Sequence, residues 1–412
     1  MENRKLSKGK VALIVIASII LVVGAFLGVV GILNIEFRKD NLEYIETSIR
    51  AVEYEEQLTP TYEDGYWTFT TDDEFKILQL TDIHIGGGWL TKTKDYKAIN
   101  AVANMVTAEK PDLVIITGDL VFPVGFAGCT FNNKEEIILI ASLMEKLGVY
   151  WTVTLGNHDS EWYSFYDRQE VADIYSDSRW TKCLFEDDGD LYGCGNSVIK
   201  IKNSQGLVTQ ALFTMDSNSY MSDKLTDAIF AVFSSSYDTF HDDQIEWYRQ
   251  EVTKIHNANL AIDEHCPMFK SLLFFHIPLL ETRKAYNQYL EAGCQDTEEV
   301  QWLYGVIEES DPYVYSSPID TDMFETIVEL GSTQGMFFGH DHINNIALTY
   351  KGINMEYGMS VDYLAYIGID KEGKQRGCKV ITVQPDGSYD SVNNNYYQDK
   401  YAIYPREVVS ME

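Results

Sequence analysis

The feature that most constrains the fold is a short apolar run that ends in metal-binding side chains and then in glycine. Residues 75–80 form the run, Asp82 and His84 follow it, and residues 86–88 are all glycine. A bounded apolar run of this length is typical of a buried strand, and the glycines indicate the turn that ends it. Side chains alternate along a strand, so Asp82 and His84 should point to one side at its carboxyl end. In open α/β sheets, ligands bind at this edge.

The same pattern recurs four more times downstream. The later blocks are Gly118-Asp119, Gly156-Asn157-His158-Asp159, His276 and Gly339-His340-Asp341-His342. One histidine after a strand is ordinarily structural, but here five of the eight histidines fall in blocks of one kind. Three histidines stay outside the blocks and are expected on the surface or at helix caps: His241, His256 and His265. Asp, His and Asn ligands without cysteine favour Mn, Fe, Zn or Ni.

Strands and helices alternate between these blocks. Helices are predicted over residues 95–110 and 133–147, and strands over 112–117 and 149–155. This rhythm is typical of βαβ units and a largely parallel sheet.

The rest of the chain is less regular. Strands are predicted at 207–215, 271–275 and 335–338, helices at 242–256 and 320–330, and an edge strand at 66–70. We expect the acidic, aromatic segment 291–318 to be a loop insertion near the site. Short strands at 346–350, 353–357 and 378–383 suggest a second sheet.

The N-terminal segment predicts a membrane anchor. Val11 to Ile35 carries no charged residue and follows four basic residues, Arg4, Lys5, Lys8 and Lys10. A stretch of about 20 apolar residues can cross a hydrocarbon core of roughly 30 Å, and the basic flank should stay in the cytoplasm. We therefore expect a single-pass signal anchor in the cell membrane with the following domain extracytoplasmic. The alternative is a cleaved signal peptide and a secreted protein. The charged segment from Phe37 to Thr61 is interpreted as a stalk or short helix.

The net charge and the cysteine spacing restrict which partners and which thiol chemistry are expected. The net charge of −31 repels polyanions, so no nucleic-acid partner is expected. The six cysteines form no CxxC pair, which argues against a zinc ribbon or thioredoxin motif. Cys183 and Cys194 flank an acidic loop and are interpreted either as a disulfide or as two free thiols.

The five blocks, taken in order, resemble the calcineurin-like metallophosphoesterase family, whose pattern is D-x-H, G-D, G-N-H-D/E, a lone H and G-H-x-H. The match spans Phe75 to Ile343, and the flanking sequence is most similar to the purple acid phosphatase 29-like or Dcr2-like branch. The resemblance implies a four-layer α/β/β/α sandwich in the α/β class, preceded by a transmembrane helix. The expected division is a basic tail (1–10), the anchor (11–35), a stalk with the first edge strand (36–70) and the catalytic domain (71–412).

The resemblance also implies a centre of two divalent ions, with Mn favoured. One ion would be held by Asp82, His84 and His342, and the other by Asn157, His276 and His340. Asp119 would bridge them, and a metal-bound hydroxide would be the nucleophile. His158 would contact the phosphoryl oxygen or protonate the leaving group, with Asp159 orienting its ring.

One residue departs from the purple acid phosphatases. These enzymes carry a tyrosine that ligates ferric iron three residues after the bridging aspartate, and this chain has Phe122 there. A purple, Tyr-ligated ferric centre is therefore not expected.

These patterns predict a membrane-anchored, metal-dependent hydrolase of small phosphate esters. Two alternatives stay open: a phosphodiesterase acting on nucleotides or phospholipid head groups, and a non-catalytic binding protein on the same fold.

Overall fold

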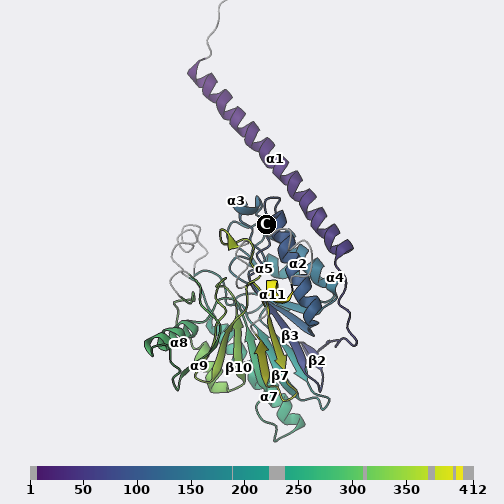
Figure 1. The fold of residues 1–412 in the computed structure, drawn as a ribbon, viewed down its shortest axis with the longest axis vertical. Coiled ribbons are helices and arrows are strands. Elements are labelled where there is room, and N and C mark those ends of the chain that lie inside the picture. Colours follow the sequence, from purple (N-terminus) through teal and green to yellow (C-terminus); the bar gives the residue numbers. More distant parts are fainter. Residues whose placement is uncertain are drawn as a thin grey trace, which may run out of the picture.

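The protein is described from a computed structural model that covers residues 7–187, 189–221, 237–309, 313–369, 376–392 and 396–401. The basic residues Arg4 and Lys5 lie outside the described residues. Two β-sheets form the centre of the molecule (Figure 1).

The smaller sheet contains the first three site strands. Its five strands are, in spatial order, β14 (Tyr389–Val392), β13 (Lys379–Val383), β3 (Phe75–Leu80), β4 (Leu113–Thr117) and β5 (Trp151–Thr154). The β3, β4 and β5 strands are parallel, as the βαβ rhythm predicts, and β13 is antiparallel to β3.

The larger sheet has nine strands. In spatial order they are β1 (Thr61–Glu63), β2 (Tyr66–Thr70), β6 (Ser197–Lys202), β7 (Val208–Thr214), β8 (Lys270–Phe274), β10 (Thr333–Phe338), β12 (Ile353–Tyr357), β11 (Ala347–Tyr350) and β9 (Val300–Tyr304). Its central strands β7, β8, β10 and β12 run parallel.

Helices cover the outer faces of both sheets. On the small sheet they are α2 (Lys92–Glu109), α4 (Asn133–Leu147) and α5 (Arg168–Tyr175), and on the large sheet α7 (Asp242–Ile262), α8 (Leu280–Glu291) and α9 (Met323–Leu330). The domain also has two short helices, α3 (Gly125–Gly128) and α11 (Tyr397–Lys400).

Successive side chains along each strand point to opposite faces of its sheet, and they contribute to three separate hydrophobic cores. In β3, Ile77 packs between the sheets, whereas Leu78 faces the helices of the small sheet. In β8, Leu272 joins the core between the sheets and Leu273 faces the helices of the large sheet. Three cores separate four layers, so the predicted α/β/β/α sandwich is confirmed.

Three of the sequence predictions need correction. The 66–70 strand is β2, which is not at the edge, because β1 pairs with its outer side. The 291–318 segment is not wholly a loop, because it contains the edge strand β9. The three late strands do not form one sheet: β11 and β12 extend the large sheet, and β13 pairs with β3 in the small one.

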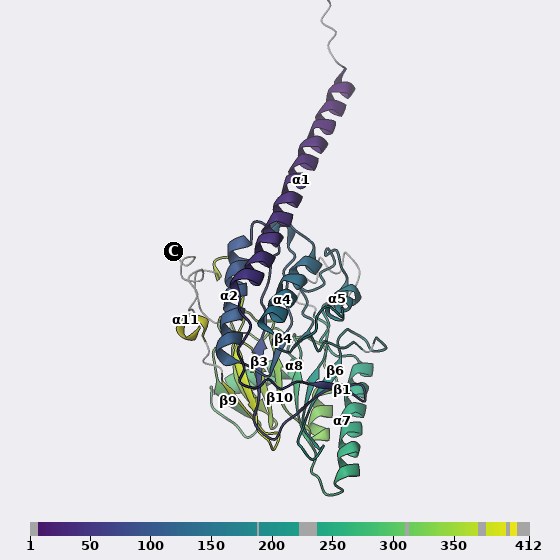
Figure 2. The same cartoon turned by 90° about the vertical axis from the view of Figure 1, so that its right-hand side faces the viewer.

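The N-terminal helix α1 (Lys8–Ser48) is longer than the apolar segment. Its second half packs on the domain beside α2 and α4 (Figure 2), with Phe37, Asn41 and Ile45 buried. Ile49 and Val52, which follow it, belong to the same core as α2 and α4. The segment 37–61, predicted as a stalk or short helix, is helical up to Ser48, and it is buried against the domain at Phe37, Asn41, Ile45, Ile49 and Val52.

Of the two interpretations of Cys183 and Cys194, the structure has the free thiols. Burial raises the pKa of each thiol to about 12, so neither is reactive at neutral pH.

Candidate metal centre

Five parallel strands bring their carboxyl ends to one edge of the molecule. The predicted site residues follow these ends: Asp82 and His84 after β3, Asp119 after β4, Asn157 and His158 after β5, His276 after β8, and His340 and His342 after β10. Because the two sheets pack face to face, residues from both meet at this edge.

The histidine and carboxylate side chains form two groups. The first contains Asp82, His84, Asp119 and His342, and the second contains Asp119, His276 and His340. Within each group the potential ligand atoms lie within 4.8 Å of one another. Asp119 belongs to both groups, as expected of a bridging ligand.

One oxygen of Asp119 lies between the two groups. Its Oδ2 atom is 3.5 Å from His84 Nε2 and 3.2 Å from His276 Nε2. Its Oδ1 atom accepts a hydrogen bond from the backbone N–H of His158 (2.8 Å). Burial by itself would raise the pKa of Asp119, but His276 and His158 hold it well below its usual range. The group is therefore an anionic carboxylate.

Four of the predicted ligands have a left-handed backbone conformation, which sets the direction of their side chains. Asp82, His84, Asp119 and His340 have φ angles of 50°, 51°, 49° and 80°. Such residues cost about 1–3 kcal/mol each and persist only where their surroundings hold them. Since β3 ends at Leu80, Asp82 and His84 do not alternate along a strand as expected; they follow it in irregular backbone.

Two of the motif glycines are required by close packing. A Cβ atom on Gly156 would lie 2.1 Å from Asp119 Oδ1. A Cβ atom on Gly339 would lie 1.9 Å from Thr81 Oγ1 and 2.6 Å from Asp82 Oδ2. Any larger residue at either position would push a metal-binding block out of place.

The hydrogen bonds leave ligand atoms available. His276 Nδ1 lies 2.8 Å from the Thr117 carbonyl oxygen, which fixes the ring and leaves Nε2 for a ligand. Asn157 Nδ2 donates to the Tyr220 hydroxyl (3.2 Å), which leaves its Oδ1. Several buried atoms at the centre have no hydrogen-bond partner: His84 Nε2, Asp119 Oδ2, Asn157 Oδ1, His276 Nε2 and His340 Nδ1. Since unpartnered buried polar atoms are costly, this donor set fits divalent cations.

Asp362 is a member of the centre that no sequence motif indicated. Its Oδ2 is 3.2 Å from His342 Nδ1, and its Oδ1 is 3.6 Å from His84 Nδ1. Burial would raise the pKa of Asp362, but His84 and His342 hold it well below its usual range. Its carboxylate thus faces the Nδ1 atoms of two predicted ligands of the first ion.

The expected pairing of Asp159 with the His158 ring is wrong. The Asp159 carboxylate accepts hydrogen bonds from the backbone N–H groups of Asp119, Val121 and Gly156 (3.0, 3.1 and 2.7 Å). The ring partner is Glu161, whose Oε1 is 2.7 Å from His158 Nδ1. Because the chain turns after β5, the carboxylate three residues on reaches the ring, while the adjacent one faces backbone.

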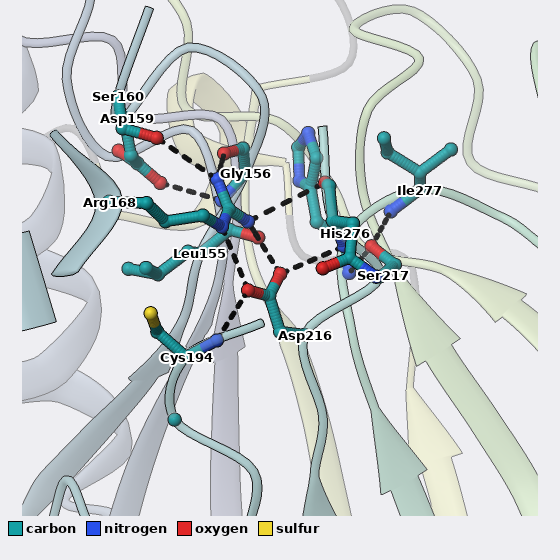
Figure 3. Close-up of polar contacts among 12 residues, drawn as sticks. Leu155, Gly156, Asp159, Ser160, Arg168, Cys194, Asp216, Ser217, His276 and Ile277 are labelled. Atoms are coloured by element: carbon teal, nitrogen blue, oxygen red, sulfur yellow. Dashed lines mark hydrogen bonds and ion pairs between the residues drawn. The ribbon is translucent and has the colours of Figure 1, made fainter. Parts of the chain in front are cut away.

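Arg168 connects the Gly156–Asp159 segment, which follows β5, to Asp216 at the end of β7 (Figure 3). Its guanidinium binds both carboxylate oxygens of the fully buried Asp216 and donates to the carbonyl of Gly156 (2.9 Å). The neighbouring Ser217 hydroxyl accepts the backbone N–H of His276 (3.3 Å). The network therefore fixes residues of the small sheet relative to a predicted ligand on the large one.

Phe122 borders the centre where a ferric-binding tyrosine would stand. Its ring centroid is 5.3 Å from that of His84 and 4.9 Å from that of His158, both edge-on. A pocket of about 360 Å³ opens above the two groups, and its wall includes Tyr220, Tyr237 and Tyr366.

A family model described as calcineurin-like phosphoesterase matches residues 75–344. The chain belongs to the calcineurin-like phosphoesterase family. The resemblance carried by the five blocks is thus confirmed, and the site lies at the edge that the matched strands form.

Relatives of this chain include proteins named as phosphatases. One of Arabidopsis thaliana, named probable inactive purple acid phosphatase 28, is 26% identical over 72% of this chain and 73% of its own length. The Saccharomyces cerevisiae protein named phosphatase DCR2 is 24% identical over 68% of this chain and 46% of its own length. A solved dimetal phosphatase from Danio rerio is 12% identical, with a TM-score of 0.48 over 78% of this chain and 99% of its own.

Proposed function

We propose that this chain is a membrane-anchored, metal-dependent hydrolase of phosphate esters. The observation that carries the proposal is the convergence of all seven predicted ligands on one edge, where five of them have a buried potential ligand atom without a hydrogen-bond partner. A binding protein that had lost catalysis would be expected to lack a ligand, and none is missing.

The residues divide into two ligand sets in this proposal. Asp82, His84 and His342 would hold one divalent ion, Asn157, His276 and His340 would hold the other, and Asp119 would serve both sets. Ions bound there would supply Lewis-acid stabilisation of phosphoryl oxygens and an activated water. In this proposal Asp362 orients the rings of His84 and His342. Asp159 positions Asp119 by accepting its backbone N–H.

His158 acts on the substrate. Its side chain is partly exposed and lines the pocket, and its Nδ1 is held by Glu161. Burial lowers the pKa of His158, but Asp119 and Glu161 outweigh this effect and raise it above its usual value. A protonated ring bordering the pocket can stabilise a phosphoryl oxygen or donate a proton to the leaving group.

Membrane anchoring is proposed from α1. The helix contains an 18-residue window with a mean hydropathy of 3.1. The basic flank places its N-terminus in the cytoplasm and the domain outside. Removal by signal cleavage is the alternative, but the buried positions of α1 from Val30 to Ile45 favour a helix that stays attached.

A substrate panel tests the hydrolase proposal. Purified full-length protein, stripped with chelator and reloaded with Mn²⁺, is offered p-nitrophenyl phosphate, bis-p-nitrophenyl phosphate and pyrophosphate. We expect product release from at least one ester, its loss on chelation and its return with Mn²⁺. Protein that holds two ions per chain but hydrolyses none of them would instead be a binding protein.

A further inference from the structure

The packing of α1 leaves little helix to separate the domain from a membrane. The buried positions of this helix start at Val30 and continue at Asn34, Phe37, Asn41 and Ile45. Residues 11–29 are exposed on all sides. At 1.5 Å per residue they span about 28 Å, which matches a hydrocarbon core of about 30 Å. The domain would therefore begin where the hydrocarbon ends.

The helix leaves the domain at the metal edge. Asn34 accepts the backbone N–H of Trp89 and donates to the carbonyl of Cys129, each at 3.0 Å. Closer to the C-terminal end of α1, Asp40 forms an ion pair with Lys92 at the start of α2 (2.8 Å). Since α2 begins after the carboxyl end of β3, the exposed part of α1 extends past the edge that carries the site (Figure 1).

Exposed apolar side chains gather on loops at this exit. The set, here called the apolar collar, consists of Trp89 (38% exposed), Leu90 (49%), Phe131 (42%), Trp162 (51%) and Phe165 (66%). Phe165 donates its backbone N–H to the Phe131 carbonyl (2.9 Å), and their rings are 6.5 Å apart.

The collar is connected to the helix by one hydrogen bond and to the site by sequence adjacency. Trp89 is bound to α1 through Asn34. Trp162 directly follows Glu161, whose carboxylate contacts His158 at the pocket. The collar therefore includes one residue bound to the emerging helix and one residue next to a pocket side chain in the chain.

We propose that the apolar collar rests in the membrane interface and that the pocket receives the phosphate of a lipid head group. Tryptophan and other aromatic side chains favour this interface, where apolar rings contact the acyl boundary. The bilayer is the occupant because α1 brings it to the collar with no spacer. This substrate class rests on the proposed hydrolase function, and the contact of the collar with the bilayer rests only on the proposed membrane anchoring.

Tryptophan quenching tests the collar independently of activity. Full-length protein is placed in nanodiscs of phosphatidylcholine with or without brominated acyl chains. Bromine should quench part of the emission of the wild type. The double variant Trp89→Phe/Trp162→Phe should lose that quenching, while the control Trp247→Phe/Trp302→Phe, on the large-sheet side, should keep it.

Equal quenching in the wild type and the collar variant would overturn the proposal. A collar covered by a second copy of the chain or by another protein would give that result.

A hydrolysis assay tests the substrate class. Nanodiscs containing phosphatidic acid offer a lipid monoester, nanodiscs of phosphatidylcholine alone offer a diester, and p-nitrophenyl phosphate is the soluble reference. Phe165→Ser should lower the ratio of lipid to soluble turnover by about tenfold. The control Ile262→Ser, at an exposed residue at the end of α7, should leave that ratio unchanged.

Hydrolysis of the soluble ester with neither lipid cleaved would refute the lipid substrate and leave the hydrolase proposal standing. Failure on all three substrates would count against the hydrolase itself.

Discussion

At the scale of single residues, the centre contains predicted ligands that sequence motifs indicate and two carboxylates, Asp362 and Glu161, that only the folded structure brings to them. The seven predicted ligands were identifiable because each follows a strand and three of them, Asp119, Asn157 and His340, stand directly after a glycine. Asp362 was not, because it follows no such block. It arrives through the loop after β12, where Val361 donates its backbone N–H to the Thr81 carbonyl (3.0 Å). Glu161 was missed for a similar reason, since only the turn after β5 brings it to His158.

Replacing Asp362 should weaken metal binding more than it affects the fold. Asp362→Ala leaves Nδ1 of His84 and of His342 without a carboxylate, and loss of such a partner lowers metal affinity by about 10–100-fold. Metal content after dialysis against graded chelator measures the effect. Asp390→Ala, at an exposed site on β14, is the matched control. Equal retention of metal by Asp362→Ala and the control would show that Asp362 does not orient the ligands.

The colour of the protein tests the consequence of Phe122. No phenolate can ligate iron at this position, so the protein should be colourless or pale, and the stripped form should recover activity with a divalent ion alone. Burial, together with the charge of Glu161, raises the pKa of the nearby Tyr220 phenol, which keeps it protonated. A strong visible band that bleaches with reductant would mean that another tyrosine binds ferric iron.

At the scale of elements, the two sheets are joined by a buried ion pair as well as by apolar packing. Lys379 on β13 lies 2.8 Å from Glu356 on β12, and both side chains are almost completely buried. Ser391 on β14 also donates to Glu356 (2.7 Å). The strands themselves could be predicted from the alternation of apolar residues. The sheet to which each strand belongs could not be predicted, because the pairing of β13 with β3 joins distant parts of the chain.

Breaking this ion pair should destabilise the fold. Lys379→Met leaves a buried carboxylate unpaired, which should lower the free energy of unfolding by about 3–5 kcal/mol, and Lys379→Met/Glu356→Leu should recover most of that loss. Burial would raise the pKa of Glu356, but Lys379 lowers it below its usual value. Its stabilisation is therefore present above the unfolded carboxyl pKa of about 4.3 and is lost as pH falls further. Urea unfolding at several pH values checks both statements; no deficit in the single variant would contradict them.

At the scale of the whole molecule, α1 joins a predicted anchor to the calcineurin-like phosphoesterase domain without a flexible spacer. The apolar segment was evident from the sequence. Its continuation into the domain was not, because the spacing of Phe37, Asn41 and Ile45 along a charged helix reveals a buried stripe only once α2 and α4 are placed beside it.

Orientation can be tested in intact cells. With the basic flank in the cytoplasm, protease added outside should digest the domain and leave a short fragment containing α1. Lysed cells serve as the control for access. Complete protection until lysis would place the domain on the cytoplasmic side.

The central claim, that Asp119 joins two metal sites while His158 serves the substrate, is tested most directly by metal analysis of two purified variants. Asp119→Ala removes the carboxylate shared by both groups and should lose both ions together with activity. His158→Ala should keep two ions per chain and lose most of its turnover of p-nitrophenyl phosphate, by about 10²–10⁴-fold. A metal-free His158→Ala protein, or an Asp119→Ala protein that retains both ions, would contradict the account.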